Sequence, residues 1–204
     1  STKDDFILFL KSKHPTLDKV DLGPLVADFL ISLNTVEMPK GVLTQAQEFV
    51  AAAFAMRENR TYQKHYEQEL KNLGIIDPGN KAIAMSYDFH LDANKQLKLI
   101  EINTNAAFLG LSLEMYEFTK QTPPLPFTAE DLKKSIETEM QLAGKISSMP
   151  KVAIIDETPE LQRLYIEFLV YRSYFLQWGW STQILDFSKV TNDFNFIYNR
   201  YTDF

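Results

Sequence analysis

The apolar run at Lys151–Asp156 (Lys-Val-Ala-Ile-Ile-Asp) constrains the fold more than any other stretch of this chain. Four consecutive apolar residues in so short a segment are typical of a strand that is covered on both faces, as in a parallel sheet. A helical segment is predicted at 159–178, followed by strands at 181–186 and 194–199. The order strand, helix, strand, strand indicates a small parallel sheet, so we expect an α/β fold for this part.

The first half of the chain has a different pattern, in which apolar residues recur at helical spacing. From about residue 81 the period changes to that of strands, and 92–95 (Asp-Ala-Asn-Lys) is suited to a hairpin loop. The stiff segment 121–126 (Gln-Thr-Pro-Pro-Leu-Pro) predicts a division into a helical part with a hairpin at 1–122 and an α/β domain at 123–204. The elements predicted before residue 151 are helices at 3–13, 22–34, 44–73, 106–120 and 128–145, and strands at 82–92 and 96–104.

The composition excludes several classes of function. The net charge is -6, which gives no electrostatic reason to bind nucleic acid or an anionic membrane. There is no cysteine, which excludes disulfides, thiolate metal sites and cysteine nucleophiles. No HExxH, GxSxG or Walker phosphate-loop motif is present. No apolar run approaches the roughly 20 residues that span a bilayer, and no signal peptide opens the chain. We therefore expect a cytoplasmic protein, and the sequence leaves a homodimer open.

The predicted strand at 96–104 carries the most specific chemical signal. Side chains of a strand alternate between two faces, so Glu101 and Asn103 lie side by side on one face. Ile100 and Ile102 then point the other way, toward a core. A carboxylate and an amide oxygen are hard ligands of the kind that suits Mg²⁺. The alternative is a strand of a half-solvated sheet, which also alternates polar and apolar residues without any metal.

The predicted hairpin extends this polar pair into a cluster. The register that we predict sets Ser86 opposite Glu101 and Asp88 opposite Leu99. Ser86, Asp88, Glu101 and Asn103 then share one face of the hairpin. A register displaced by one residue would remove the cluster.

Four other features carry weaker signals. The loop at 105–112 offers small residues and free helix N–H groups to an anion, unless it is a plain strand-to-helix turn. Arg200 follows a strand and suits a carboxylate or phosphate, unless it forms a surface ion pair. The segment 156–160 lies where open α/β sheets bind ligands, but it also reads as a helix start. His90 lies close to Asp88 in sequence and is either an acid–base partner or a half-exposed histidine.

The Glu-Ile-Asn-Thr sequence at 101–104, followed by the small-residue loop at 106–111, resembles the ATP-grasp ligases. The closer resemblance is to the circularly permuted branch that includes eukaryotic-type glutathione synthetase. In that branch the strand reads Glu-Ile-Asn-Thr and a small-residue segment with Phe-Gly-Gly-Leu follows it. Helices before this strand and a strand–helix–strand domain of the pre-ATP-grasp type after it also resemble that branch. The resemblance covers 81–204, and only the Glu-Ile-Asn-Thr strand is specific.

The resemblance implies an activity and a set of site residues. The full enzyme would use ATP to convert a carboxylate into an acyl phosphate, which an amine then attacks. Glu101 and Asn103 would be Mg²⁺ ligands, and ATP would bind with residues beyond this chain. The substrate would be an amino acid or a peptide. The residues expected to bind it are Ser86, Asp88, Asn105, Ser112, Arg200 and Tyr201.

The chain departs from the family at several points. Ser86 stands about where glutathione synthetase has a substrate-binding arginine, and the loop after the strand is one residue shorter with Ala in place of Ser. We therefore do not expect glutathione itself as the product. The sequence stops at Phe204, before the family's nucleotide-binding part. We expect an amino-terminal portion, truncated at its carboxyl end and inactive as a ligase on its own.

Two functions of other classes stay open from the residues. A non-catalytic module that binds a small molecule or a protein would need no convergence of the polar residues on the hairpin. A hairpin stabilised by Ca²⁺ is less well supported, because no ligand run of EF-hand type is present.

Overall fold

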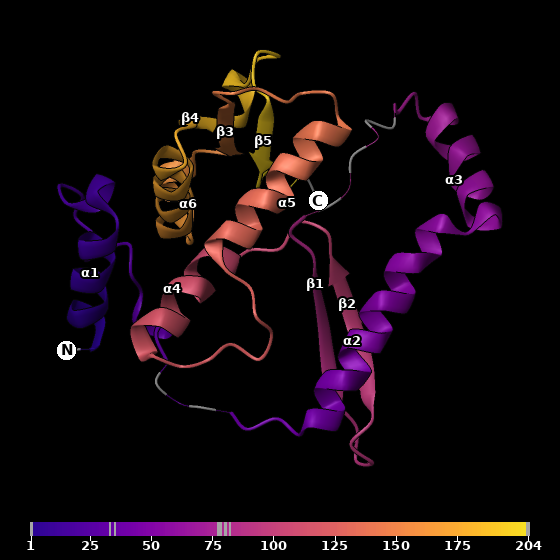
Figure 1. Ribbon diagram of the computed structural model, residues 1–204, viewed down its shortest axis with the longest axis horizontal. Helices are drawn as coiled ribbons and strands as arrows, with labels where there is room; N and C mark the ends of the chain where they lie inside the picture. Colours follow the sequence, from indigo (N-terminus) through magenta and orange to yellow (C-terminus); the bar gives the residue numbers. More distant parts are fainter. Residues whose placement is uncertain are drawn as a thin grey trace. The chain divides into compact units, whose positions relative to one another are not determined.

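The computed structural model is a mixed α/β protein with a two-stranded antiparallel sheet and a three-stranded parallel sheet (Figure 1). Contacts within the chain divide it into two compact units. The hairpin unit is Asn34–Thr104, and the larger unit joins Ser1–Leu33 to Asn105–Phe204. The structure describes residues 2–32, 34, 36–76, 79, 81 and 83–202, without the side chain of Phe29.

The boundaries of the two units differ from the division predicted at residue 122. Residues 105–122 belong with the α/β part, and so do residues 1–33 from the start of the chain. The division at residue 122, which was drawn from the proline-rich segment, stays a prediction about domains.

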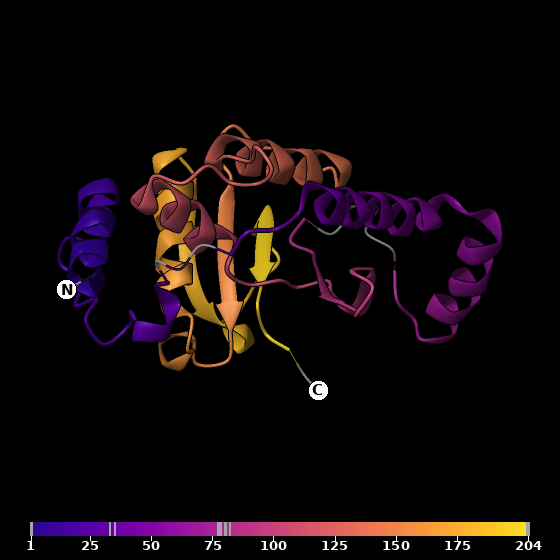
Figure 2. The ribbon, with the colours of Figure 1, turned by 90° about the horizontal axis from the view of Figure 1, so that it is seen from below.

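The parallel sheet of the larger unit has the strand order β4-β3-β5. The strands are β3 (Lys151–Asp156), β4 (Ser181–Asp186) and β5 (Phe196–Asn199). Figure 2 shows β3 and β5 pointing in the same direction. The predicted parallel sheet is therefore confirmed, and β3 and β4 have the predicted bounds. The central position of β3 explains its unbroken apolar run, because all four residues from Val152 to Ile155 are buried.

Four helices complete the larger unit, and α6 is the most buried of them. Its aromatic residues Phe168, Tyr171, Tyr174 and Phe175 belong to the core. The first turn of α5 is fixed by a capping box, in which Thr128 and Asp131 exchange side-chain-to-backbone hydrogen bonds. The helices are α1 (Thr2–Lys13), α4 (Leu109–Thr119), α5 (Ala129–Leu142) and α6 (Tyr165–Gln177).

The helix predicted at 22–34 is wrong within its described residues. A single turn forms, in which the Val26 N–H donates to the Leu22 carbonyl at 3.0 Å, and the extended backbone of Ala27 ends it. A short 3₁₀ turn at Asp28–Leu30 follows. Leu22, Val26 and Leu30 are nevertheless buried in the core cluster. The apolar spacing therefore marked a buried segment correctly, and tertiary packing overrode the local preference for a helix.

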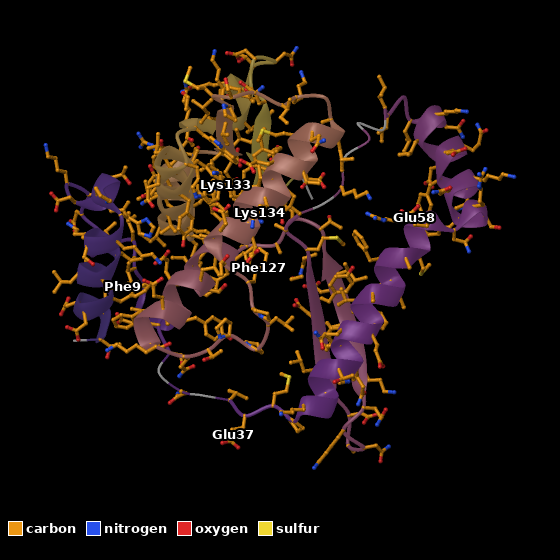
Figure 3. The ribbon with its side chains drawn as sticks, viewed as in Figure 1. Phe9, Glu37, Glu58, Phe127, Lys133 and Lys134 are labelled. Atoms are coloured by element: carbon orange, nitrogen blue, oxygen red, sulfur yellow. The ribbon has the colours of Figure 1, made fainter. Side chains whose placement is uncertain are left out.

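The hairpin unit contains two helices where one long helix was predicted at 44–73. A 3₁₀ turn at Met56–Glu58 separates them, and Figure 3 labels Glu58 at this break. The Asn59 side chain then accepts two backbone N–H groups of the next helix as its N-cap. The elements of this unit are α2 (Lys40–Ala55), α3 (Arg60–Asn72), β1 (Ser86–Leu91) and β2 (Leu97–Asn103).

The strand predicted at 82–92 begins later in the structure, and residue 82 itself lies outside the described residues. Among the described residues, every helix is too short or too polar to cross a membrane.

Candidate functional site

The polar face of the hairpin is built from residues that lie directly opposite each other on β1 and β2. Ser86 pairs with Asn103, and Asp88 pairs with Glu101. The predicted register, with Ser86 opposite Glu101 and Asp88 opposite Leu99, is therefore wrong. The observed partner of Ser86 is displaced by two residues, from Glu101 to Asn103. Because side chains alternate with a period of two, this displacement leaves all four polar residues on one face.

A β-bulge in β2 lies directly beside the polar face. Asp88 pairs with Glu101, whereas the next residue, Phe89, pairs with Leu99, so Ile100 is the extra residue. The expectation that Ile100 points toward a core is wrong, because Ile100 is 61% exposed.

The bulge explains how an irregular sequence yields two regular faces. Leu99 and Ile102 would lie on opposite faces of a regular strand, because their numbers differ by an odd amount. With the bulge between them, they pair with Phe89 and Tyr87, which share the apolar face of β1. Phe49 of α2 covers this face, with its ring edge-to-face against Tyr87 at 6.4 Å and against Phe89 at 5.5 Å.

The side chains of Asp88, Glu101 and Asn103 meet on the polar face. The Asn103 Nδ2 donates to Asp88 Oδ2 at 3.3 Å and to Glu101 Oε1 at 3.0 Å. Like charges on directly opposite residues of a hairpin repel each other, so these carboxylates favour a donor or a cation between them. Both carboxylates are exposed, which gives an ion in solvent direct access to them.

The donor set of this cluster fits a hard divalent cation. Mg²⁺ binds few protein oxygens, and two carboxylates with one amide oxygen supply that kind of ligand. Asn103 would present its Oδ1 after its amide group rotates, since the Nδ2 now faces the carboxylates. Among the described residues, no group of three or more His, Asp or Glu side chains is placed to hold a metal ion. A metal site here therefore depends on Asn103.

Two of the residues expected to bind substrate meet in the larger unit. The Arg200 Nη1 donates to the backbone oxygen of Asn105 and to its Oδ1 at 3.1 Å. The backbone N–H of Arg200 donates to Ile155 at 2.8 Å, which ties this residue to the central strand β3. Arg200 therefore holds the loop that follows the Glu-Ile-Asn-Thr strand.

Tyr201 and Ser112 make local contacts in the same unit. The Tyr201 ring stacks on Phe187 with ring centroids 3.9 Å apart. Ser112 lies inside α4, and its hydroxyl donates to the Leu109 carbonyl at 2.8 Å. Their expected role in substrate binding stays a prediction.

The N-terminus of α4 is capped by a buried carboxylate from α6. Glu167 is fully buried and accepts the backbone N–H of Phe108 at 2.8 Å and of Gly110 at 3.2 Å. Phe108, which precedes the first residue of the helix, has a positive φ of 76°. Burial raises the pKa of Glu167, and the backbone N–H donors and Arg200 only partly offset that rise. Two of the N–H groups at this helix start, those of Phe108 and Gly110, therefore bind Glu167.

The candidate site residues fall into two groups, one in each unit. Asn103 contacts Asp88 and Glu101 in the first group, and Arg200 contacts Asn105 in the second. The hairpin unit contains Ser86, Asp88, Glu101 and Asn103, and the larger unit contains Asn105, Ser112, Arg200 and Tyr201.

The carboxyl edge of the parallel sheet has its own hollow, of about 390 Å³, beside the ends of β3 and β4. Asp186 organises the loops there, accepting the Thr158 N–H at 2.9 Å and the Ser188 N–H at 3.0 Å. The Ser188 hydroxyl and the two N–H donors lower the pKa of Asp186. The segment 156–160 forms a 3₁₀ turn at Pro159–Leu161, which agrees with its reading as a start of helical structure.

A buried polar network in the larger unit was missed by sequence reasoning. Glu114 of α4 is fully buried, and the Tyr174 hydroxyl donates to its Oε1. His14 Nε2 lies 3.2 Å from the same oxygen, and Lys13 Nζ lies 3.0 Å from Glu114 Oε2. The local sequence offered one signal, because Glu114 lies among apolar residues of α4 and a glutamate buried there needs a partner.

Three residues of this network, Ser173, His14 and Glu114, are of the types that form the catalytic triad of a serine hydrolase. His14 Nδ1 is 3.0 Å from the Ser173 Oγ, and His14 Nε2 faces Glu114. All three side chains are 0% exposed, so neither a substrate nor water from bulk solvent reaches the hydroxyl. The arrangement is therefore structural, and it joins the end of α1 to α4 and α6.

Comparison of the chain with protein-family models, with curated proteins and with solved structures gives no match. The case for a function therefore rests on the two groups of residues and on the Glu-Ile-Asn-Thr sequence.

Proposed function

We propose that this chain is a portion of an ATP-dependent carboxylate–amine ligase that resembles the circularly permuted, glutathione synthetase-like ATP-grasp enzymes. The observation that carries the proposal is the contact of Asn103 with both Asp88 and Glu101 on one exposed face. The motif needs Glu101 and Asn103 side by side, and the bulged hairpin supplies that arrangement together with a second carboxylate.

The three hairpin residues would hold Mg²⁺, which supplies electrostatic stabilisation of the phosphates of ATP when it is bound. Asp88 and Glu101 contribute the negative charge, and Asn103 contributes a neutral oxygen that orients the set. The hairpin also keeps its apolar side against α2, so the polar side stays turned to solvent. The protein contributes positioning and charge to an acyl-phosphate reaction, without a covalent nucleophile of its own.

The larger unit would hold the substrate, an amino acid or a peptide. Arg200 uses its Nη1 for Asn105, which leaves its other guanidinium donors to bind a substrate carboxylate. Asn105, Ser112 and Tyr201 are the other members of the implied substrate-binding set in this unit, and Ser86 and Asp88 are its members in the hairpin unit. The buried Glu167 holds the backbone of the same loop by accepting the N–H groups of Phe108 and Gly110.

One observation favours a second function, a non-catalytic module that binds a small molecule or a protein. The Asn103 Nδ2 already bridges the two carboxylates, so the hairpin needs no cation to relieve their repulsion. In such a module the polar face is a solvated surface, and the amide keeps this orientation permanently.

Binding of Mn²⁺ to the isolated chain separates these two functions. Mn²⁺ accepts the same oxygen ligands as Mg²⁺, and it broadens the NMR signals of nearby nuclei. Under the ligase proposal, substoichiometric Mn²⁺ broadens the amide signals of 86–88 and 101–103 first, and added Mg²⁺ restores them. Glu101→Gln abolishes this broadening, whereas Glu48→Gln, an exposed carboxylate on α2 of the same unit, leaves it unchanged. Weak, uniform broadening over all acidic side chains would favour the non-catalytic module.

The ligase activity itself needs a polypeptide that joins this chain to a nucleotide-binding part. There, Glu101→Gln should lower substrate-dependent phosphate release from Mg·ATP by about a hundredfold or more. The fold should stay intact, which the circular dichroism spectrum would show. Unchanged phosphate release would overturn the assignment of Glu101.

A further inference from the structure

A cavity of about 280 Å³ lies in the larger unit, apart from all the residues proposed to bind Mg²⁺ or substrate. It forms where the end of α1, the middle of α4 and the start of α5 meet. The proline-rich segment 121–126 and Phe127, which follows it, form one wall, and Figure 3 labels Phe127. The side chains that line the cavity and enter the argument are Lys13, Tyr116, Glu117, Pro123, Phe127 and Tyr174.

The two carboxylates near this cavity are partnered unequally. Lys13 is shared between them, because its Nζ pairs with Glu114 and donates to Glu117. Glu114 is fully buried, and the Tyr174 hydroxyl gives it a further donor. His14 Nε2 also lies 3.2 Å from Glu114, so Glu114 has three partners, whereas among the described residues Lys13 is the side chain that pairs with Glu117.

Glu117 is placed to bind a donor from a ligand. Its side chain is 59% exposed, and its Oε2 accepts from Lys13. Within the part of the chain that the structure describes, no hydrogen bond to its Oε1 is present. A carboxylate with one oxygen fixed and the other free binds an ammonium group in a defined direction.

The walls of the cavity suit an organic cation. Tyr116, Phe127 and Tyr174 are aromatic, and the faces of aromatic rings attract cations. Phe127 and Pro123 are half-buried, so part of their apolar surface is already accessible to a ligand. The prolines before Phe127 restrict the backbone of this wall, which lowers the entropy lost when a ligand binds.

We propose that this cavity is a binding site for a small primary amine with a short apolar body. The ammonium group would pair with Glu117 Oε1, and the apolar body would lie against Phe127 and Tyr116. Lys13 attracts an anion less than a free lysine would, because its ammonium is already paired with two carboxylates. The site is independent of the proposed ligase function, since it uses none of the hairpin residues and none of the loop at 105–112.

The test compares three probes of similar shape and different charge on the purified chain. They are 2-phenylethylamine, the neutral 2-phenylethanol and the anionic 3-phenylpropanoate. We expect the amine to shift the amide NMR signals of 113–129 in a saturable way, and to bind about tenfold or more tightly than the alcohol, since a charge-assisted hydrogen bond is worth that much. The anion should not bind.

Two variants and a matched control test whether Glu117 binds the ammonium group and Phe127 contacts the apolar body. Glu117→Gln should reduce the affinity for the amine to that of the alcohol. Glu137→Gln is the control, because Glu137 also pairs with a lysine, Lys133 at 3.9 Å, but lines no part of this cavity. Phe127→Ala should weaken the amine and the alcohol equally and so keep their ratio.

Three results would overturn the proposal. The first is equal binding of the amine and the alcohol, which would make the cavity merely apolar. The second is tighter binding of the anion, which would show that Lys13 governs the site. The third is a Glu117→Gln variant that binds the amine like the parent chain. Loss of the hairpin's Mn²⁺ response would bear on the ligase proposal alone.

Discussion

Two fully buried glutamates of the larger unit have opposite pKa shifts, and their partners explain the difference. Burial acts on both in the same direction, toward a higher pKa. For Glu114 this effect of burial is outweighed by three partners, which are the His14 ring, the Tyr174 hydroxyl and Lys13. The pKa of Glu114 is therefore lowered. For Glu167 the partners are chiefly backbone N–H groups, and its pKa stays raised. Their contributions to stability therefore depend on pH with opposite signs.

Glu114→Gln should lower the free energy of unfolding of the larger unit by about 3 kcal/mol at neutral pH, because it removes one charge from a buried ion pair. The pKa of Glu114 is lower in the folded state, so this stabilisation is present at neutral pH and is lost as the pH falls through that lowered pKa. Urea unfolding followed by the fluorescence of Trp178 and Trp180 measures it, since both tryptophans lie in this unit. Glu137→Gln serves as the control, and a variant as stable as the parent at neutral pH would contradict this reading.

Glu167→Gln should show the opposite pH dependence. The pKa of Glu167 is raised in the folded state, so protonation favours folding, and its contribution is largest at low pH and falls as the pH rises through the raised pKa. Relative to the glutamine variant, the parent chain should therefore lose stability as the pH rises from the ordinary glutamate pKa through the raised pKa of Glu167. Urea unfolding at several pH values measures this difference. A difference that grows with pH would contradict the assignment.

The sequence could predict contacts between neighbours on one strand but not those between distant segments. Glu101 and Asn103 are two positions apart, so alternation alone placed them together. The partners of Glu167 lie in a different helix, and nothing in the local pattern of α6 names them. His14 and Glu114 are separated by most of the chain, and their pairing follows only from how α1 packs on α4 and α6.

At the level of elements, prediction succeeded where burial alone decides the structure. The run Val152–Ile155 could only be a covered strand, and β3 has the predicted bounds. The segments 22–34 and 44–73 were overextended, because helical spacing continues through Ala27 and through Met56–Glu58, where the backbone turns. Asn59 was a usable signal for the second break, as a good N-cap residue in the middle of a predicted helix.

The hairpin register failed for a different reason. Two one-residue differences add up to the displacement at Ser86. The predicted register, continued to the loop, sets Leu91 opposite Gln96, whereas Leu91 pairs with Leu97, and the extra residue Ile100 adds the second shift. A bulge absorbs that extra residue and returns the apolar and polar side chains to their own faces. The polar cluster survived the wrong register only because the error was an even number of residues.

Deletion of Ile100 tests this account of the bulge. The shortened strand alternates regularly, so Asp88 should still pair with Glu101 and Ser86 with Asn103, with a change in stability of less than about 1 kcal/mol. Deletion of Ile102 instead places Asn103 opposite Tyr87 on the apolar face and should disrupt the hairpin. Cross-strand nuclear Overhauser effects between the paired residues report both outcomes. Loss of the Asp88–Glu101 contact in the first variant would show that the bulge itself fixes the register.

Across the whole chain, burial is distributed unevenly between the two units. The larger unit contains a continuous core around α1, α4 and α6. In the hairpin unit, Val42 is the one described residue that counts as fully buried. Stability in a protein follows the buried apolar contacts of each part, so the unit that carries the proposed metal ligands has little stability of its own.

Hydrogen exchange of the whole chain should therefore separate the two units. Amides of α3, β1 and β2 should be protected at least about a hundredfold less than those of β3 and α6, because a difference of a few kcal/mol in opening free energy gives that ratio. Exchange measured by NMR resolves these segments individually. If Mg²⁺ binds Asp88, Glu101 and Asn103, its addition should slow exchange in β1 and β2 and leave β3 unchanged, since a ligand stabilises only the folded form that binds it. Equal protection of β2 and β3 without metal would show that the hairpin unit is stabilised by something other than its own buried residues.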